Sequence, residues 1–481
     1  MKMKIRNKTA FTDEVTPLEE ENAEVSYEAA LEGIVLLEND GALPLTPGKV
    51  ALYGAGAGMT IKGGTGSGEV NERHAISILE GMEAAGFTVT TKNWINSYAE
   101  EYRKGEAQYA AEFRRRMMKL DVVNMMGTPY QHPFGQPVTI EDVYESDTDT
   151  CIYVIARQAG ESADRKLKNY EYSLSDEEKA NLAMCAANYE KMIVVINVGS
   201  VFDMSFLDEI TGIDAVVYYA QQGMMGGKAF ADLISGKVSP SAKTVDTWPK
   251  KYEDIPFAME YSYLNGDVDE EYYREGIYVG YRYFDSYDVE PRYPFGYGLS
   301  YTKFSVEKEK VEVEGTQAIV TAKVTNTGSI YSGKEVVQLY VSCPQTGMAK
   351  EYQKLAAFAK TEVLRPGENG MVRLSFNIQE LASYREEDAA YVLEKGDYIL
   401  RLGSSSRDTS ASAVLVLDEE IVTEQCEHIC PTVLKVRELE PPMTDDPEEI
   451  QDNDVERIPM KTADIATVGH RYEVPEIYSS P

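Results

Sequence analysis

The hydrophobic pattern of this chain changes its period part-way along the sequence, and this change limits the kinds of domain that the chain can form. Up to Pro249, short apolar runs alternate with segments of helical spacing. The apolar runs are 50–53, 87–90, 151–156, 192–198 and 213–219, and the helical segments include 27–37, 77–85, 175–189 and 228–235. Strands that are apolar on both faces and alternate with helices are typical of a mostly parallel sheet covered by helices. We therefore predict an α/β domain over residues 25–250.

Beyond Phe304 the apolar residues recur with a period of two instead. The alternation is clear in residues 337–341, and turn signals such as the one at 395–397 separate the alternating segments. About seven short strands in about 110 residues are typical of an immunoglobulin-like or fibronectin type III-like sandwich. The second domain is therefore expected to be all-β and to span residues 304–417.

The remaining segments have other compositions. Residues 1–24 are polar and are expected to be a lead-in, whereas residues 251–303 are rich in Tyr and Gly, which suits a connector lying over other surfaces. Residues 418–481 include an acidic, proline-containing stretch that is typical of a linker or tail. Residues 97–150 interrupt the α/β pattern as an insertion, and the aromatic residues between 98 and 117 are spaced for an amphipathic helix packed on the domain.

Charge and cysteine content narrow the choice of partner and compartment. The chain has 47 Lys and Arg against 80 Asp and Glu, for a formal net charge of −33. Nucleic acids and anionic membranes bind clustered basic residues, so neither is expected as a partner. Five irregularly spaced cysteines do not form a disulfide framework and fit a reducing compartment. Residues 1–21 hold no apolar run of signal-peptide length, and no segment is apolar enough to span a membrane, so we expect a cytoplasmic protein.

The first candidate site is the glycine-rich segment 62–68, which reads KGGTGSG shortly after the predicted strand 50–53. Glycines allow close backbone approach to a ligand, but the spacing of a phosphate-binding loop is absent. The preceding segment 54–58 resembles a dinucleotide fingerprint, although Met59 stands where a third glycine belongs. Nucleotide binding and a loop that only turns tightly are both open interpretations of these glycines.

The second candidate site follows the predicted strand 151–156. Glu161 lies there with Arg157, Asp164 and Arg165 close by in the sequence. Ligands of open α/β sheets bind beyond the carboxyl ends of the strands, so this glutamate is placed to donate or accept a proton. The alternative interpretation is a solvated loop of ion pairs.

A third candidate is the segment 426–430, which reads CEHIC. Cysteine and histidine ligate zinc, but a structural site needs four ligands and no second pair lies nearby in the sequence. The four histidines are scattered, and no Ser/His/Asp arrangement follows from their spacing. We therefore expect neither a metal nor a cofactor.

Several segments together resemble glycoside hydrolase family 3, the β-glucosidase-type enzymes. They are 30–39 with 43–45, 62–68 with 70–71, 160–165, 236–241, 275–285 and 294–301, of which the last, PFGYGLSY, is the most specific. In order and spacing they cover residues 27–417. One departure is local, because this chain has Met224 and Met225 where the family pattern often carries a carboxylate.

The resemblance implies an α/β sandwich domain followed by a fibronectin type III-like domain. It also implies that the acid/base glutamate comes from a loop of the α/β sandwich, where the match is Glu161. The loop carrying Thr65, Ser67 and Gly68 is the one that approaches the sugar in the family. Lys62 and Arg157, together with Asp164 and Arg165, are expected to bind substrate or support these loops, and Asp164 is expected to offset part of the arginines' positive charge.

The resemblance places the nucleophilic aspartate in a separate TIM barrel, within a Ser-Asp-Trp-like motif. A barrel needs about 250 residues, and neither end of this sequence is long enough to hold one. The only tryptophans are Trp94 and Trp248, and neither follows an aspartate. We therefore expect the first part of a circularly permuted member, with the barrel supplied in cis beyond residue 481 or in trans.

The expected function is to supply the general acid/base for retaining hydrolysis of terminal β-linked sugars. Without a nucleophile, the chain is expected to be inactive by itself. The expected partners are therefore a carbohydrate substrate and a TIM barrel, and a homo-oligomer is compatible with the sequence. The alternative is a non-catalytic carbohydrate-binding or scaffold subunit, and the sequence leaves the sugar and the linkage open.

Overall fold

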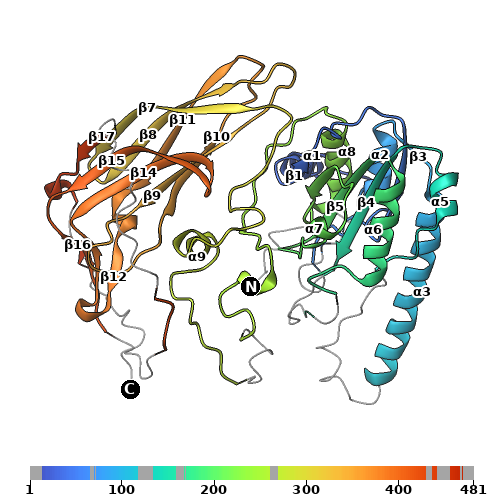
Figure 1. Cartoon of the computed structure of the whole chain (residues 1–481), viewed down its shortest axis with the longest axis horizontal. Helices are drawn as coiled ribbons and strands as arrows, with labels where there is room; N and C mark the ends of the chain where they lie inside the picture. The colour runs from blue at the N-terminus through green and yellow to red at the C-terminus, as the bar shows by residue number, and fades with distance from the viewer. Residues whose placement is uncertain are drawn as a thin grey trace, which may run out of the picture.

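The computed structural model describes residues 13–64, 70, 72–117, 134–158, 167, 170–260, 269–428, 436–440, 455–465 and 468–469. These residues form an α/β unit and a β-sandwich, and a long connector runs between the two (Figure 1). The predicted order of an α/β domain followed by an all-β domain is confirmed.

A six-stranded sheet in the order β1-β6-β5-β4-β2-β3 forms the centre of the α/β unit. The strands are β1 Val35–Asn39, β2 Lys49–Tyr53, β3 Thr88–Val89, β4 Thr150–Arg157, β5 Lys191–Val198 and β6 Ala215–Tyr218. Strands β2 to β6 pair in parallel, and β1 lies antiparallel to β6 at one edge. Each predicted apolar run coincides with one of the parallel strands, and β4 and β6 are buried along their whole length.

Helices pack on this sheet and begin at side chains that cap them. They are α1 Pro17–Leu31, α2 Ile78–Ala84, α3 Lys92–Met117, α5 Ile140–Glu145, α6 Asp176–Asn188, α7 Phe206–Glu209 and α8 Gly226–Ile234. Four of them start with a Ser or Thr whose hydroxyl accepts from the backbone three residues on, where an acidic side chain returns the bond. Helices α2 and α8 can approach closely because Gly81 has no side chain. A Cβ at this position would lie 1.9 Å from the carbonyl oxygen of Gly227.

The start of the chain differs from the prediction. The expected helix over 27–37 is wrong in its second half, because α1 ends at Leu31 and Val35–Asn39 is strand β1. Val35, Leu36 and Leu37 are all buried, and Val35 and Leu36 pair with Tyr218 and Val217 of β6. Helix α1 also begins at Pro17, inside the segment expected to be a polar lead-in, with Thr16 as its cap.

The amphipathic helix predicted within the insertion is confirmed as α3, which begins at Lys92 and runs along one flank of the α/β unit (Figure 1). Its first turns pack inward, since Trp94, Ile95 and Tyr98 are buried in the core of the unit. Arg115, in its last turn, pairs with Glu112 on the exposed side. The insertion is therefore anchored at its amino-terminal end.

The β-sandwich consists of a sheet β10-β9-β14-β15-β17 and a sheet β11-β8-β7, with a small third sheet β12-β13-β16-β18. The strands are β7 Phe304–Glu314, β8 Gln317–Asn326, β9 Val336–Ser342, β10 Lys354–Lys360, β11 Asn369–Asn377, β12 Ser383–Arg385, β13 Ala390–Leu393, β14 Gly396–Ser405, β15 Asp408–Leu417, β16 Ile421–Gln425, β17 Glu456–Pro459 and β18 Val468–Gly469. Alternating residues such as Val320, Leu339 and Leu400 point into the shared core. The predicted period-two strands are thereby confirmed.

Part of the segment expected to be an acidic linker or tail belongs to this sandwich, which corrects that expectation. Strand β17 pairs in parallel with β15, and β18 pairs in parallel with β16. Met460 and Ile465 are buried in the sandwich core. The acidic composition of the surrounding residues conceals these isolated apolar positions.

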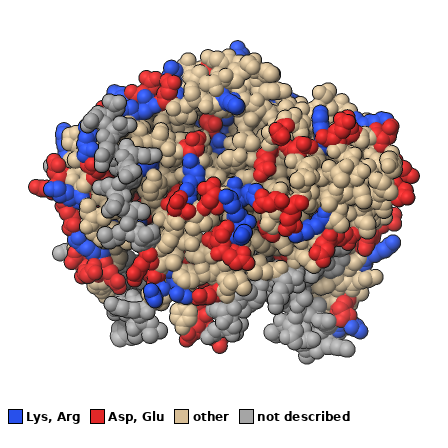
Figure 2. All heavy atoms as spheres, in the orientation of Figure 1, with Lys and Arg blue, Asp and Glu red and all other residues tan. Residues whose placement is uncertain are grey.

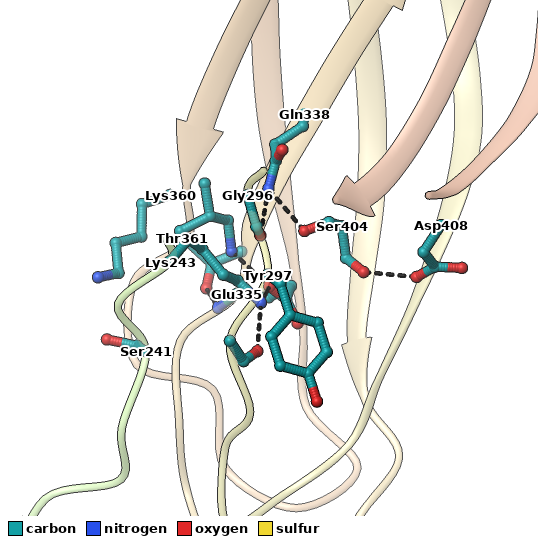
Figure 3. A network of polar contacts seen from close by, with 12 residues as sticks. Ser241, Lys243, Gly296, Tyr297, Glu335, Gln338, Lys360, Thr361, Ser404 and Asp408 are labelled. Carbon is teal, nitrogen blue, oxygen red and sulfur yellow. Dashed lines mark hydrogen bonds and ion pairs between the residues drawn. The ribbon is translucent and has the colours of Figure 1, made fainter. Parts of the chain in front are cut away.

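The connector joins the two units by hydrogen bonds to both, and its most specific motif, residues 294–301, lies at the seam. On one side, the Leu299 amide donates to the carbonyl of Leu36 in β1 at 2.8 Å. On the other side, Gln338 Nε2 of β9 donates to the carbonyls of Gly296 (3.0 Å) and Ser404 (2.6 Å) (Figure 3). The motif therefore bridges the two units.

Ion pairs add to this seam. Lys243 Nζ lies 2.8 Å from Glu335 Oε1, and Glu32 at the end of α1 pairs with Lys334 and Lys360 from the sandwich. On the face shown in Figure 2, acidic side chains are scattered over both halves, with basic ones among them. Among the residues that the structure describes, no helix has the length and apolar character needed to cross a bilayer.

Candidate active site

The carboxyl ends of β2, β4, β5 and β6 lie along the same edge of the sheet, because these strands are parallel. The segments that follow them include both candidate loops found in the sequence. Clefts that bind ligands in open α/β sheets form at such an edge. The contacts at the carboxyl ends of these strands therefore show how the two candidate loops are held in place.

Asn197, near the end of β5, ties the neighbouring segments together. Its Oδ1 accepts from the Ile61 amide at 2.7 Å, and its Nδ2 donates to the carbonyls of Ile61 (2.8 Å) and Ala220 (2.7 Å). The side chain is completely buried. Sequence reasoning missed this residue, although a lone amide inside the apolar run 192–198 was a usable signal.

Lys62 closes the base of the glycine-rich loop. Its Nζ donates to the Val70 carbonyl at 2.8 Å and forms an ion pair with Glu72, so the ammonium joins the two ends of the loop. The hydrogen bond from Lys62 also lowers the pKa of Glu72 below its ordinary value. The Gly223 amide donates to the Lys62 carbonyl at 2.9 Å, which fixes the backbone at the same point.

Arg157 closes the base of the second loop in a comparable way. Its Nε donates to the Tyr170 carbonyl (2.7 Å), and its Nη2 donates to the Ser173 carbonyl (2.8 Å). Nη1 donates to the Ala156 carbonyl (2.8 Å), and both terminal nitrogens bond the Glu178 carboxylate at 2.8 and 2.7 Å. All five N–H groups of the guanidinium are thus used within the protein.

Two aromatic rings cover the same guanidinium. Its central carbon lies 4.3 Å from the ring centroid of Phe134 and 5.1 Å from that of Phe202. The Arg157 side chain is only 6 % exposed and that of Glu178 is 0 % exposed. Arg157 is therefore a buried part of the base of the loop. Glu178, a partner that the sequence did not suggest, neutralises its charge.

The other predicted site residues, Thr65, Ser67 and Gly68 in the first loop and Glu161, Asp164 and Arg165 in the second, lie outside the described residues. Their assignments stay predictions. Asp164 was expected to offset the charge of the arginines. For Arg157 the contact that does so is the one to Glu178.

Gln158 brings the two loops together. Its Nε2 donates to the Gly63 carbonyl at 2.9 Å, which links the first residue beyond Arg157 to the first residue beyond Lys62. Both candidate loops therefore start side by side, each closed by a cation at its own base. The sequence placed each loop after a predicted strand but gave no sign of this direct contact.

Comparison with known proteins identifies the family of this chain. Residues 34–301 match the glycosyl hydrolase family 3 C-terminal domain. The chain belongs to glycosyl hydrolase family 3. Residues 335–406 match the fibronectin type III-like domain.

Individual relatives extend the similarity. A β-glucosidase of Ruminococcus albus is 36 % identical over 85 % of this chain and 42 % of its own length, and β-glucosidase A of Butyrivibrio fibrisolvens is 34 % identical over 87 % and 54 %. Among solved structures, β-glucosidase 3B of Thermotoga neapolitana in complex with α-D-glucose is 34 % identical, with a TM-score of 0.72 over 84 % of this chain and 55 % of its own. The chain thus spans about half the length of these relatives.

The glycines at 54–58 have a packing role within this family fold. A Cβ on Gly54 would lie 2.2 Å from the carbonyl oxygen of Val154, and one on Gly56 would lie 2.5 Å from Cγ1 of the same residue. A Cβ on Gly58 would lie 2.6 Å from Cγ2 of Ile95 in α3. Contacts with β4 and α3 therefore account for these glycines without a dinucleotide.

The two remaining sequence signals carry little polar chemistry. Met224, in the segment where the family pattern often carries a carboxylate, contributes its backbone carbonyl to the Ile76 amide at 2.9 Å. Cys426 Sγ lies 3.9 Å from Glu424 Oε1, and Cys430 is outside the described residues. In the described part of the chain, no three His, Cys, Asp or Glu side chains are grouped to hold a metal ion.

Proposed function

We propose that this chain supplies the proton-handling part of a β-glucosidase-type active site that hydrolyses terminal β-linked sugars with retention. The observation that carries the proposal is the pair of loops at the carboxyl edge of the sheet, closed by Lys62 and Arg157 and joined through Gln158. The relatives that match the chain at 34–36 % identity and carry the name β-glucosidase support the substrate class.

In this proposal Glu161 is the general acid/base. It protonates the glycosidic oxygen as the bond to the anomeric carbon breaks, and it later takes a proton from the water that releases the sugar. The nucleophilic aspartate comes from a TIM barrel, in cis or in trans, and its carboxyl group lies about 5–5.5 Å from that of Glu161 as retaining hydrolysis requires. The chain by itself therefore has no covalent step.

The acid has to be protonated before it can donate, so its pKa must be raised. A barrel and a substrate covering the loop would remove water from Glu161, and the nearby nucleophile would add a like charge, and both effects raise a carboxyl pKa. The guanidinium of Arg157, four residues before Glu161, would lower that pKa if its charge had no partner. Because Glu178 neutralises Arg157, this opposing effect is reduced.

The proposal is tested with a chimera in which this chain replaces the matched part of the Ruminococcus albus β-glucosidase, which then supplies the remaining 58 % of its own length. We expect the chain alone to have little or no activity on an aryl β-glucoside and the folded chimera to be active. Turnover by the chain alone would refute the division of labour. A folded chimera that binds glucose but does not turn over would instead favour a carbohydrate-binding or scaffold subunit.

A further inference from the structure

The loop that carries the proposed acid/base is held at its base by one side chain that sequence reasoning did not consider. Glu178 is the third residue of α6 and is completely buried. Its carboxylate accepts from the Ser175 amide at 2.9 Å, which caps the helix, and from both terminal nitrogens of Arg157. The same carboxylate therefore fixes the start of α6 and the end of β4.

Arg157 extends this connection to both ends of the loop. It is itself the last residue of β4, where the chain leaves the sheet, and its Nε and Nη2 bond the Tyr170 and Ser173 carbonyls, where the chain returns. Tyr170 has a φ of 57°, a left-handed conformation that is unfavourable for a tyrosine and needs support from its surroundings. The bond to its carbonyl and the edge contact of its ring with Phe134, at 6.1 Å between centroids, supply that support.

We propose that Glu178 is a positioning residue for acid/base catalysis, which acts through Arg157 to fix where the loop carrying Glu161 leaves and rejoins the sheet. This inference rests on the proposed function. Gln158, the next residue, links this point to the glycine-rich loop, because its Nε2 donates to the Gly63 carbonyl. The Glu178 carboxylate holds the Arg157 guanidinium where it bonds the Tyr170 and Ser173 carbonyls. It does not touch the sugar.

The β-sandwich offers a matched control. Lys350 and Glu394 form a second buried ion pair, with side-chain exposures of 4 % and 9 %. Lys350 Nζ also donates to the carbonyls of Pro344 (2.9 Å) and Met348 (3.0 Å), so this pair holds a loop of the other unit in the same manner. Glu394→Gln therefore removes an equivalent buried charge away from the proposed site.

The first test measures amide hydrogen exchange in the 481-residue chain without substrate. Glu178→Gln leaves the guanidinium uncompensated and should speed exchange of the Ser175 amide and of the Asp203 amide, which bonds the Tyr172 carbonyl at 2.8 Å, by about tenfold or more. Glu394→Gln should leave both amides unchanged. Equal exchange in Glu178→Gln and the unsubstituted chain would overturn the proposal.

A second variant guards against loss of folding. Arg157→Met combined with Glu178→Gln leaves no buried charge without its partner, yet it removes the bonds to the Tyr170 and Ser173 carbonyls. We expect the double variant to fold and to show the same faster exchange at the base of the loop. Because no activity is measured, these results are independent of whether the chimera is an active glycosidase.

The catalytic part is tested in the chimera with two substrates. An alkyl β-glucoside needs a proton on its leaving group, whereas a dinitrophenyl β-glucoside does not. Glu178→Gln should lower kcat/KM on the alkyl substrate by about tenfold and change kcat/KM on the dinitrophenyl substrate, which reports only the first step, by less than about twofold. An equal loss on both substrates, or none on either, would show that Glu178 has only a structural role.

Discussion

Asn197 provides a direct test of how the edge of the sheet is assembled. Replacing it with Ala removes three hydrogen bonds and leaves the Ile61 amide and the Ile61 and Ala220 carbonyls without their partner. Each buried polar group that loses its partner costs about 1–3 kcal/mol. Since some water will enter the vacated space, we expect the free energy of unfolding to fall by about 3–5 kcal/mol.

Urea unfolding followed by tryptophan fluorescence measures this loss. Both tryptophans, Trp94 and Trp248, are buried in the α/β unit, so their emission reports on the part of the molecule that contains Asn197. Asn188→Ala is the control, because its exposed amide bonds the carbonyl and the sulfur of Met184, one turn back in its own helix, and it should change stability by less than about 0.5 kcal/mol. A loss below about 1 kcal/mol for Asn197→Ala would refute the role of this side chain as a tie.

Two further predictions concern the connector. Burial raises the pKa of Asp285 to about 6, so the folded chain keeps a proton that the unfolded chain releases above about pH 4, and the stability due to this group is lost as the pH rises from 4 to 6. In urea unfolding, Asp285→Asn should therefore gain about 3 kcal/mol relative to the unsubstituted chain between pH 4 and pH 7, and a constant difference would contradict this. Gly296→Ala places a Cβ 2.1 Å from Gln338 Oε1 at a φ of +78°, and we expect a loss of about 2–4 kcal/mol in thermal or urea unfolding. Gly315→Ala, at a φ of +62° with nothing within 4 Å, should cost only about 1 kcal/mol, and equal losses in the two variants would argue against a close-packed seam.

Both domains could be predicted from the sequence because each has its own pattern of hydrophobic residues. The parallel strands are apolar along their whole length since both faces are buried, and the sandwich strands alternate. Strand β1 was mistaken for the end of a helix because Ile34 to Leu37 form a short apolar run that fits either structure. Only the pairing of β1 with β6, about 180 residues away, decides between them.

The candidate site was predicted as two loops that each follow a strand, but the contacts between and within these loops were not predicted. Arg157 was recognised because it begins the loop, but its partner Glu178 lies 21 residues further on and looks like an ordinary member of a helix-capping motif. The bond between Gln158 and Gly63 joins residues 95 apart. Such contacts depend on the packing of neighbouring strands, which no local pattern records.

The role of Glu161 is tested most directly by Glu161→Gln in the chimera, assayed on an alkyl and a dinitrophenyl β-glucoside. We expect kcat on the alkyl substrate to fall by about 10²–10⁴-fold, while the first step on the dinitrophenyl substrate keeps nearly its full rate. Glu177→Gln, a change at an exposed glutamate of α6, should leave both rates as they were. If Glu161→Gln hydrolyses the alkyl glucoside at an unchanged rate, this chain does not supply the proton, and the account is wrong at its centre.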